Sequence, residues 1–247
     1  MTISLKSTVA APVAAYPALK ASIVLFDCNP GTRSWTVPEG VSKIRAFVVG
    51  AGGGGFRSSP YASGGGGGYA EKLIDVTPGQ ILSYTVGGGG TFGSAPTAGG
   101  TSSFGGVISA TGGGAGGSSI PGTAGAGSGG DINTTGGTGA AGSSDYGGGA
   151  SGHRSGNGQA GSMYCGGGFS SAFLGLVDGW GIGLVPGETY GRGGAKVGVD
   201  SYAMPGLGGG GVAASDSSVR AADGGIGGGG GIVGNGGPGL VGIEVIA

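Results

Sequence analysis

The chain has 247 residues, of which 72 are glycine and 11 are proline, a share typical of low-complexity sequence. Only 9% of the residues are charged and the mean hydropathy is +0.22, which excludes the highly charged, apolar-poor composition of disordered chains. The formal net charge of −1 provides no basic surface, so we expect no nucleic-acid partner. Collagen is excluded as well, because the glycine run at 64–68 breaks the G-X-Y period.

The first 22 residues form an alanine-rich segment that we expect to be an attachment arm outside the folded domain. Pro12 and Pro17 interrupt its apolar stretch, so we expect no cleaved signal peptide. Apolar runs such as 23–26 are far shorter than the roughly 20 residues that cross a bilayer. We therefore expect no membrane insertion.

Segments rich in β-branched and aromatic residues predict strands in the first half of the chain and at its end. These segments are 23–27, 34–37, 44–49, 69–76, 80–86, 102–111 and 240–246. Between two of them, Pro78-Gly79 has the residue types of a tight turn, which predicts that 69–76 and 80–86 form a hairpin. Outside the alanine-rich start, no window has a convincing helical period. Six or seven strands are enough for a small sandwich or barrel.

Glycine is distributed unevenly, since only Gly31 and Gly40 occur before residue 50. The main runs are 52–55, 64–68, 87–90, 112–114, 147–149, 166–168, 208–211 and 227–231. Flexible linkers are disfavoured as an explanation, because linkers are usually rich in serine and charge. A polyproline-II-like helix has three residues per turn and directs its N–H and C=O groups sideways. Without Cβ atoms, such helices can pack side by side and satisfy one another's backbone groups.

The predicted fold is therefore all-β: a small β-sandwich combined with a bundle of packed polyglycine-II helices, with almost no α-helix. We expect the arm at 1–22, then the sandwich with the first glycine runs at 23–117, completed by a strand at 240–247. Residues 118–239 would form the main polyglycine-II region and carry exposed loops.

One segment matches a dinucleotide-binding fingerprint, because the strand at 44–49 runs into the glycines of 50–55, and Glu71 follows about 20 residues later. That motif needs a helix directly after the glycines. Pro60 and the next glycine run exclude one. We expect no cofactor.

Other residues that could support catalysis or metal binding have no partners in sequence. His153 is the only histidine and is interpreted as a polar loop residue. Cys28 and Cys165 are too few for a metal cluster or a disulfide framework, and two separate thiols are favoured over one long-range bridge. The twelve acidic residues form no recognisable pair. We expect neither a metal site nor enzymatic activity.

Aromatic and arginine side chains lie between the glycine runs, where polyglycine offers no side chains to cover them. They could cover the ends of the helices or project from loop tips, where Tyr, Trp and Arg are common recognition residues. The candidate receptor-binding residues are Tyr146, Arg154, Tyr164, Trp180, Tyr190, Arg192 and Tyr202.

Four segments carry a resemblance to a known family. They are the WTVPEGV motif at 35–41 with the following 44–55, the segment 69–90 with its TPGQ turn, GGTSSFGG at 99–106, and GGPGL at 236–240. Together they resemble glycine-rich tail-fibre and receptor-binding proteins (adhesins) of tailed bacteriophages. The segments between them resemble that family only in composition.

The resemblance implies a protein of the phage tail that is assembled in the host cytoplasm and binds a bacterial surface receptor, either an outer-membrane protein or a surface glycan. Loops at the tip of the polyglycine bundle would bind without chemistry, and the arm at 1–22 would attach other tail proteins. A homo-oligomer, by analogy with trimeric fibres, is expected, although a monomeric tip is also compatible. Two alternatives stay open: a structural virion protein, such as a head fibre or capsid decoration, and an ice-binding polyglycine-II protein.

Overall fold

The computed structural model describes residues 22–142, 146–163, 166–167, 195–196, 202–203, 209–211 and 223–246. Over these residues the chain forms strands and extended segments and no α-helix, so the predicted all-β class is confirmed. This part of the chain accordingly has no helix that could span a membrane.

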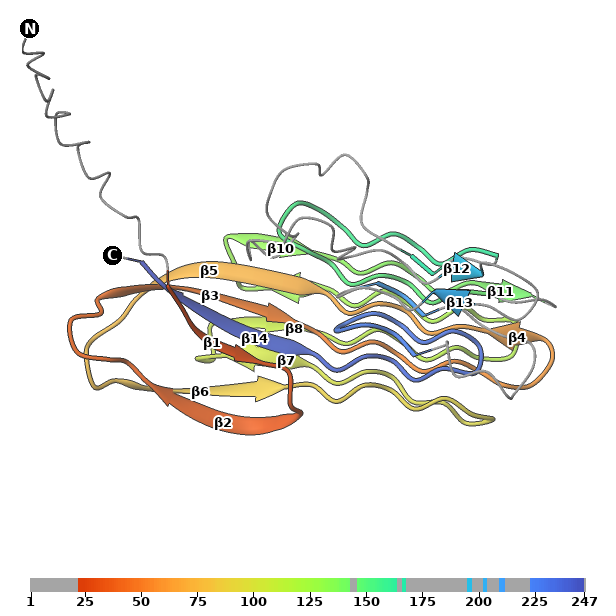
Figure 1. The fold of residues 1–247 in the computed structure, drawn as a ribbon, viewed down its shortest axis with the longest axis horizontal. Coiled ribbons are helices and arrows are strands. Elements are labelled where there is room, and N and C mark those ends of the chain that lie inside the picture. Colours follow the sequence, from red (N-terminus) through yellow and green to blue (C-terminus); the bar gives the residue numbers. More distant parts are fainter. Residues whose placement is uncertain are drawn as a thin grey trace, which may run out of the picture.

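Two five-stranded antiparallel sheets form a sandwich (Figure 1). Sheet A has the order β1 (Ser22–Asp27), β14 (Leu240–Val245), β3 (Lys43–Val49), β5 (Tyr69–Asp75) and β10 (Ile132–Thr134). Sheet B has the order β2 (Gly31–Thr36), β6 (Ile81–Val86), β7 (Ser102–Phe104), β8 (Ile108–Ala110) and β9 (Gly127–Ser128). Two short pairs join β4 (Tyr61–Ala62) to β11 (Ala141–Gly142) and β12 (Ala195–Lys196) to β13 (Tyr202–Ala203).

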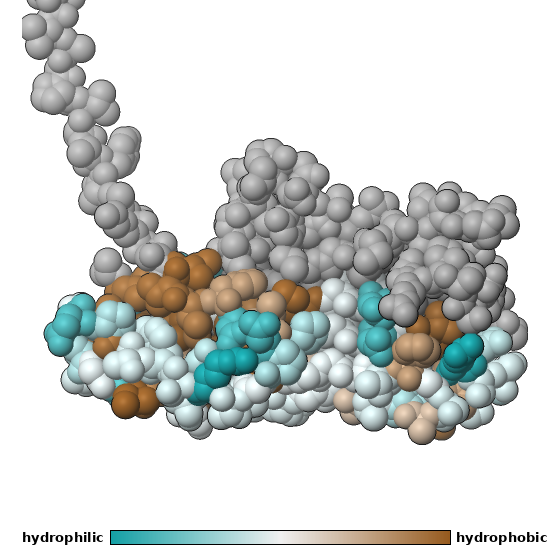
Figure 2. All heavy atoms as spheres, turned by 60° about the horizontal axis from the view of Figure 1, so that its bottom comes forward, coloured by the Kyte–Doolittle hydropathy of each residue, from teal (hydrophilic) through white to brown (hydrophobic). Residues whose placement is uncertain are grey.

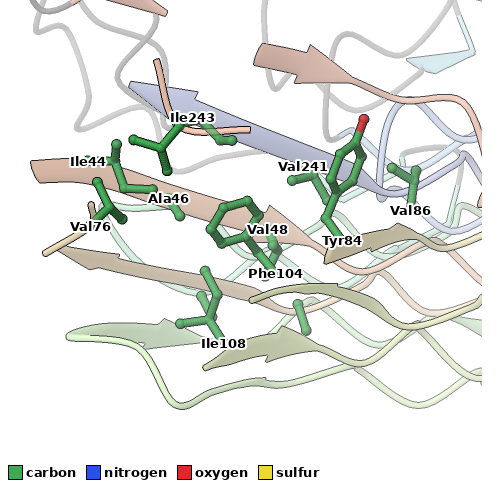
Figure 3. Close-up of a cluster of buried hydrophobic side chains, with 13 residues drawn as sticks. Ile44, Ala46, Val48, Val76, Tyr84, Val86, Phe104, Ile108, Val241 and Ile243 are labelled. Carbon is green, nitrogen blue, oxygen red and sulfur yellow. The ribbon is translucent and has the colours of Figure 1, made fainter. Parts of the chain in front are cut away.

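The main hydrophobic core lies between the two sheets (Figure 3). In β3, Ile44 and Val48 belong to this core, whereas Phe47 packs in a second cluster on the other face of sheet A. From sheet B, Phe104 and Ile108 are buried against them. This alternation is the period of two that the sequence shows, and it fixes which face of each strand is buried.

The turn at 77–80 forms as predicted, but the hairpin prediction is wrong. The Gln80 N–H donates to the Thr77 carbonyl at 3.0 Å, and Gly79 has a φ of +81°. However, β5 pairs with β3 and β10, whereas β6 pairs with β2 and β7. The turn therefore crosses from sheet A to sheet B. Proline followed by a left-handed glycine makes a type II turn, whose twist does not suit a two-residue hairpin.

The segment predicted as one strand at 102–111 is instead the hairpin β7–β8. Its turn contains Gly105 and Gly106, whose φ angles of +60° and +69° are both left-handed. Two successive left-handed residues are the requirement of a type I′ turn, the usual hairpin turn. Glycine meets that requirement without strain.

The glycine runs pack as straight rods, which we define as the extended glycine-rich segments of the described chain. The Gly50 and Gly53 amides donate to the carbonyls of Gly68 and Gly65, both at 2.9 Å. The same neighbour is thus met at every third residue, which is the period of polyglycine II. The amides of 64–66 donate in turn to Gly230, Gly114 and Gly137 on three different rods. The predicted packing of glycine rods is therefore confirmed for these residues.

The rods lie too close together for side chains. A Cβ built on Gly53 would lie 2.0 Å from the carbonyl oxygen of Gly114, and one on Gly64 would lie 1.9 Å from that of Gly53. Real Cβ atoms do not approach backbone oxygens so closely. We call the packed set of rods the lattice; it needs glycine for close approach rather than for flexibility.

The sandwich and the lattice are one continuous structure along the long axis of the molecule (Figure 1). β3 continues directly into the rod 50–55, and the rod 64–68 continues directly into β5. The expected division at residues 117 and 118 is not seen, because β9 and β10 belong to the sandwich sheets. Early rods such as 50–55 also pair with rods near the C-terminus. Each strand that leaves the sandwich continues into a rod of the lattice and determines where that rod lies. The border between sandwich and lattice is therefore crossed many times along the chain and does not fall at one residue.

Candidate functional site

Several of the described loops that join rods lie at the end of the lattice opposite the sandwich (Figure 1). We call this surface the tip, and it consists of the loops 56–61, 91–97, 117–121 and 232–235. The Arg57 N–H donates to the Gly93 carbonyl at 2.9 Å, and the Ser119 N–H donates to the Pro60 carbonyl at 3.4 Å. The Gly234 carbonyl accepts from the Gly55 amide at 3.0 Å. Loops far apart in sequence therefore form one surface.

The tip carries apolar and aromatic side chains together with a guanidinium group. Ile120 is 65% exposed and Phe92 is 38% exposed. Arg57 is exposed, and Tyr61 is half-buried. Figure 2 shows hydrophobic residues toward both ends of the molecule, with a paler glycine-rich surface between them. Because the closely packed rods leave little room for large side chains, the tip is where several rods can present them together.

Tyr146, a predicted receptor-binding residue, lies beside the tip. The strand pair β4–β11 places Gly142 opposite Tyr61, and Tyr146 forms a β-bridge with Met163. Tyr146 is half-buried because its ring covers Gly142, where a Cβ would lie 2.2 Å from the phenol oxygen. Met163 is 50% exposed. The structure thus brings Tyr146 close to the tip loops, and its contact with a receptor stays a prediction.

Arg154, another predicted binding residue, lies near the sandwich and is engaged in an ion pair. Its Nε lies 2.6 Å from Oε2 of Glu71 on β5, and Glu71 also pairs with Arg45 at 3.4 Å. Burial by itself would lower the pKa of Arg154, but the hydrogen bond with Glu71 and the neighbouring Tyr69 raise it above its ordinary value. Arg154 therefore stays charged and ties its loop to sheet A.

Tyr69 completes this buried polar network. Its hydroxyl donates to Glu71, and burial followed by the Glu71 charge raises the pKa of the phenol. The phenol therefore stays protonated and acts as a donor. The buried Glu71 carboxylate accepts hydrogen bonds from Tyr69 and Arg154 and forms an ion pair with Arg45, which suits a structural role.

Four other predicted binding residues lie outside the described residues: Tyr164, Trp180, Tyr190 and Arg192. For Tyr202 the structure gives the backbone pairing with Lys196 in β12–β13. Receptor contact by these five residues stays a prediction.

Arg57, Phe92 and Ile120 are not among the binding residues that the sequence predicts. The order of strands, glycine runs and loops along the chain does indicate which loops lie at the tip. When a glycine run leaves a strand and a second run returns to the next strand, the loop between them must lie at the far end of the lattice. The loop 56–61 follows this pattern between β3 and β5, and 91–97 follows it between β6 and β7.

The segment that matched a dinucleotide fingerprint belongs to the lattice. A Cβ on Gly52 would lie 1.9 Å from the Gly228 carbonyl oxygen, so neighbouring chain occupies the space beside this glycine. Glu71 is engaged with Arg45 and Arg154 rather than directed toward the run 50–55. Within the described ranges, no three His, Cys, Asp or Glu side chains group in a way that could hold a metal ion. Cys28 is a free thiol, and Cys165 lies outside those ranges.

Comparison with protein families gives one finding. A family model described as a glycine-rich domain matches residues 27–246, which includes both the sandwich and the lattice. No curated protein matches the chain.

Proposed function

The chain belongs to the glycine-rich domain family, and from that premise we propose that it is an adhesin of a bacteriophage tail, which binds a bacterial surface receptor without chemistry. The observation that carries the proposal is the tip, where Arg57, Phe92 and Ile120 are presented together at one end of the glycine-rich lattice. The sequence resemblance to tail-fibre adhesins supports the same assignment.

The lattice gives the tip a physical advantage for binding. Its backbone amides donate hydrogen bonds to carbonyls of neighbouring rods, as the amides of residues 64–66 do. The ends of the rods are therefore held in place before a partner binds. A preorganised surface loses less conformational entropy when a partner docks. Exposed aromatic and aliphatic side chains next to an arginine are typical anchors of recognition surfaces.

The opposite end of the molecule would connect the adhesin to the virion. β1 begins at Ser22, where the arm predicted at 1–22 ends, and it lies in the sandwich, away from the tip (Figure 1). We propose that this end attaches to other tail proteins, in a trimeric assembly or as a single copy at the fibre end. Receptors of either class, an outer-membrane protein or a surface glycan, fit this arrangement.

The proposal is tested by binding of the labelled full-length protein to a panel of intact bacterial strains. We expect saturable binding to some strains, and the double variant Phe92→Ser/Ile120→Ser should weaken it by about tenfold or more if the tip holds binding anchors. Ile81→Ser is the matched control, because Ile81 is 68% exposed but lies on the sandwich.

Saturable binding by the wild type that the double variant retains would contradict the assignment of the tip. Absence of binding to every strain, with the protein located on the phage head by antibody labelling, would instead support the structural virion alternative.

A further inference from the structure

The tip loop 91–97 is anchored to the lattice at its two ends. The Gly90 and Gly93 amides donate to the carbonyls of Gly52 and Gly55, at 2.8 and 3.0 Å. Thr97 closes the loop, because its N–H donates to the Thr91 carbonyl at 3.0 Å and its hydroxyl accepts from the Thr91 N–H at 2.9 Å. The base of the loop is therefore fixed by backbone contacts and by Thr91 and Thr97.

The amide of Phe92 breaks this backbone pattern. It donates to Oδ1 of Asn235, at 3.1 Å, rather than to a carbonyl of a neighbouring rod. Asn235 comes from the loop 232–235, which is 143 residues away in sequence. The Asn235 side chain thus accepts the backbone hydrogen bond of Phe92, the residue of this loop that carries an exposed aromatic ring.

Asn235 is itself held from both sides. Its N–H donates to Oδ1 of Asp223 at 2.7 Å, and its carbonyl accepts from the Gly224 amide at 2.9 Å. Because the backbone of Asn235 is fixed in this way and its side chain is short, the side-chain amide has little freedom to move. It therefore links the segment 223–224 to the loop that carries Phe92.

We propose that Asn235 is the positioning residue of the tip: it holds the backbone of Phe92, and with it the ring, in the pose that binds the receptor. The binding part of this inference rests on the proposed function. The positioning part does not, and it can be measured without a receptor. Aspartate keeps an acceptor oxygen at the same distance from the backbone, whereas alanine has none.

The first experiment measures amide hydrogen exchange by NMR in the wild type, Asn235→Ala and Asn235→Asp. We expect exchange at Phe92 to accelerate about fivefold in Asn235→Ala, the size expected for one exposed hydrogen bond. Exchange at Gly90 and Gly93 should not change, and Asn235→Asp should restore protection at Phe92. Asn133→Ala is the matched control, because the Asn133 side chain bonds Gly130 near the sandwich.

Unchanged exchange at Phe92 in Asn235→Ala would overturn the inference. Faster exchange at Gly90 and Gly93 as well would also overturn it, because Asn235 would then stabilise the lattice generally rather than position one residue.

The second experiment measures binding of the same variants to intact bacterial strains, with the melting temperature as a fold control. We expect Asn235→Ala to bind about fivefold more weakly at an unchanged melting temperature, and Asn235→Asp to restore binding. Equal binding by Asn235→Ala and the wild type would overturn the inference and leave the proposed function standing. Wild-type protein that binds no strain would overturn the proposed function, while the exchange result would still decide the positioning of Phe92.

Discussion

The sandwich and the lattice fill their interiors with different groups of atoms. In the sandwich, side chains such as Phe104 and Ile108 fill the space between two sheets. In the lattice, backbone atoms fill it, and each rod satisfies its amides on several neighbours. The sandwich is stabilised chiefly by apolar burial, whereas the lattice depends on hydrogen bonds and close backbone contact.

This difference determines where side chains can vary. A sandwich core tolerates swaps that conserve volume, because neighbouring side chains can adjust. A rod such as 64–68 tolerates no Cβ on the inside, because backbone atoms surround it. Side chains that could bind a partner are therefore displaced to the tip and to the sandwich.

Removing a large side chain should damage the sandwich most. Phe104 is fully buried in the core, so Phe104→Ala leaves a cavity and should lower the free energy of unfolding by about 3 to 5 kcal/mol. Urea denaturation measures this change. Phe104→Leu is the control and should cost less than about 1.5 kcal/mol. Equal effects of the two variants would mean that apolar volume does not hold the sandwich.

Adding one methyl group should damage the lattice nearly as much. A Cβ on Gly229 would lie 2.2 Å from the Gly64 carbonyl oxygen, so Gly229→Ala must push two rods apart. We expect a loss of about 3 kcal/mol in the same denaturation assay. Gly88→Ala is the matched control, because its Cβ would only meet Pro30 at 3.8 Å. If both alanines were tolerated equally, the rods would not be closely packed.

The sequence predicts the local features of this fold better than the contacts between distant segments. Alternating apolar residues located β3, β5 and β6 to within one residue, because burial of one face is a local property. The pairing of β5 and β6 in different sheets was missed, since the partner of a strand depends on distant segments. Runs of glycine predicted the rods, because three residues per turn and the absence of Cβ are intrinsic to polyglycine.

The candidate site was less predictable than the fold. Tyr146 lies beside the tip, and its contact with a receptor stays a prediction. The prediction for Arg154 rests on its residue type, whereas its side chain pairs with Glu71. That ion pair joins residues 83 positions apart, so no local pattern reveals it. Phe92 is not among the predicted residues because the prediction used Tyr, Trp and Arg as the recognition types. Its place at the tip depends on Asn235, which is 143 residues away.

The variant Arg154→Ala tests whether Arg154 stabilises the fold or contacts a receptor. Because Arg154→Ala leaves the buried Glu71 with one cation fewer, we expect stability to fall by about 1.5 kcal/mol. Binding to bacterial cells should not change. Lys43→Ala removes an exposed pair with Asp75 and should cost less than about 0.5 kcal/mol. Weaker binding by Arg154→Ala at unchanged stability would show that the sequence-based prediction of a receptor contact is right.

The smallest expected effect is a pH dependence at the junction of the two halves, where His153 is buried beside the sandwich. Burial lowers the pKa of His153 from its ordinary value of 6.5, although the Asn157 backbone opposes this shift. The unfolded chain therefore binds a proton more readily than the folded one. The contribution of His153 is complete above pH 6.5 and is lost as the pH falls through its lower folded pKa.

Asp27 has the same sign of pH dependence but acts in a lower range. Burial would raise its pKa, yet hydrogen bonds from Asn29 and Tyr84 and the charge of Arg33 together hold it below 3.8. Urea denaturation between pH 7.5 and 5 should therefore report on His153 without a contribution from Asp27. We expect stability to fall over this range in the wild type and to fall less in His153→Gln. An identical slope in both proteins would show that the buried imidazole does not couple protonation to the packing of the rods against the sandwich.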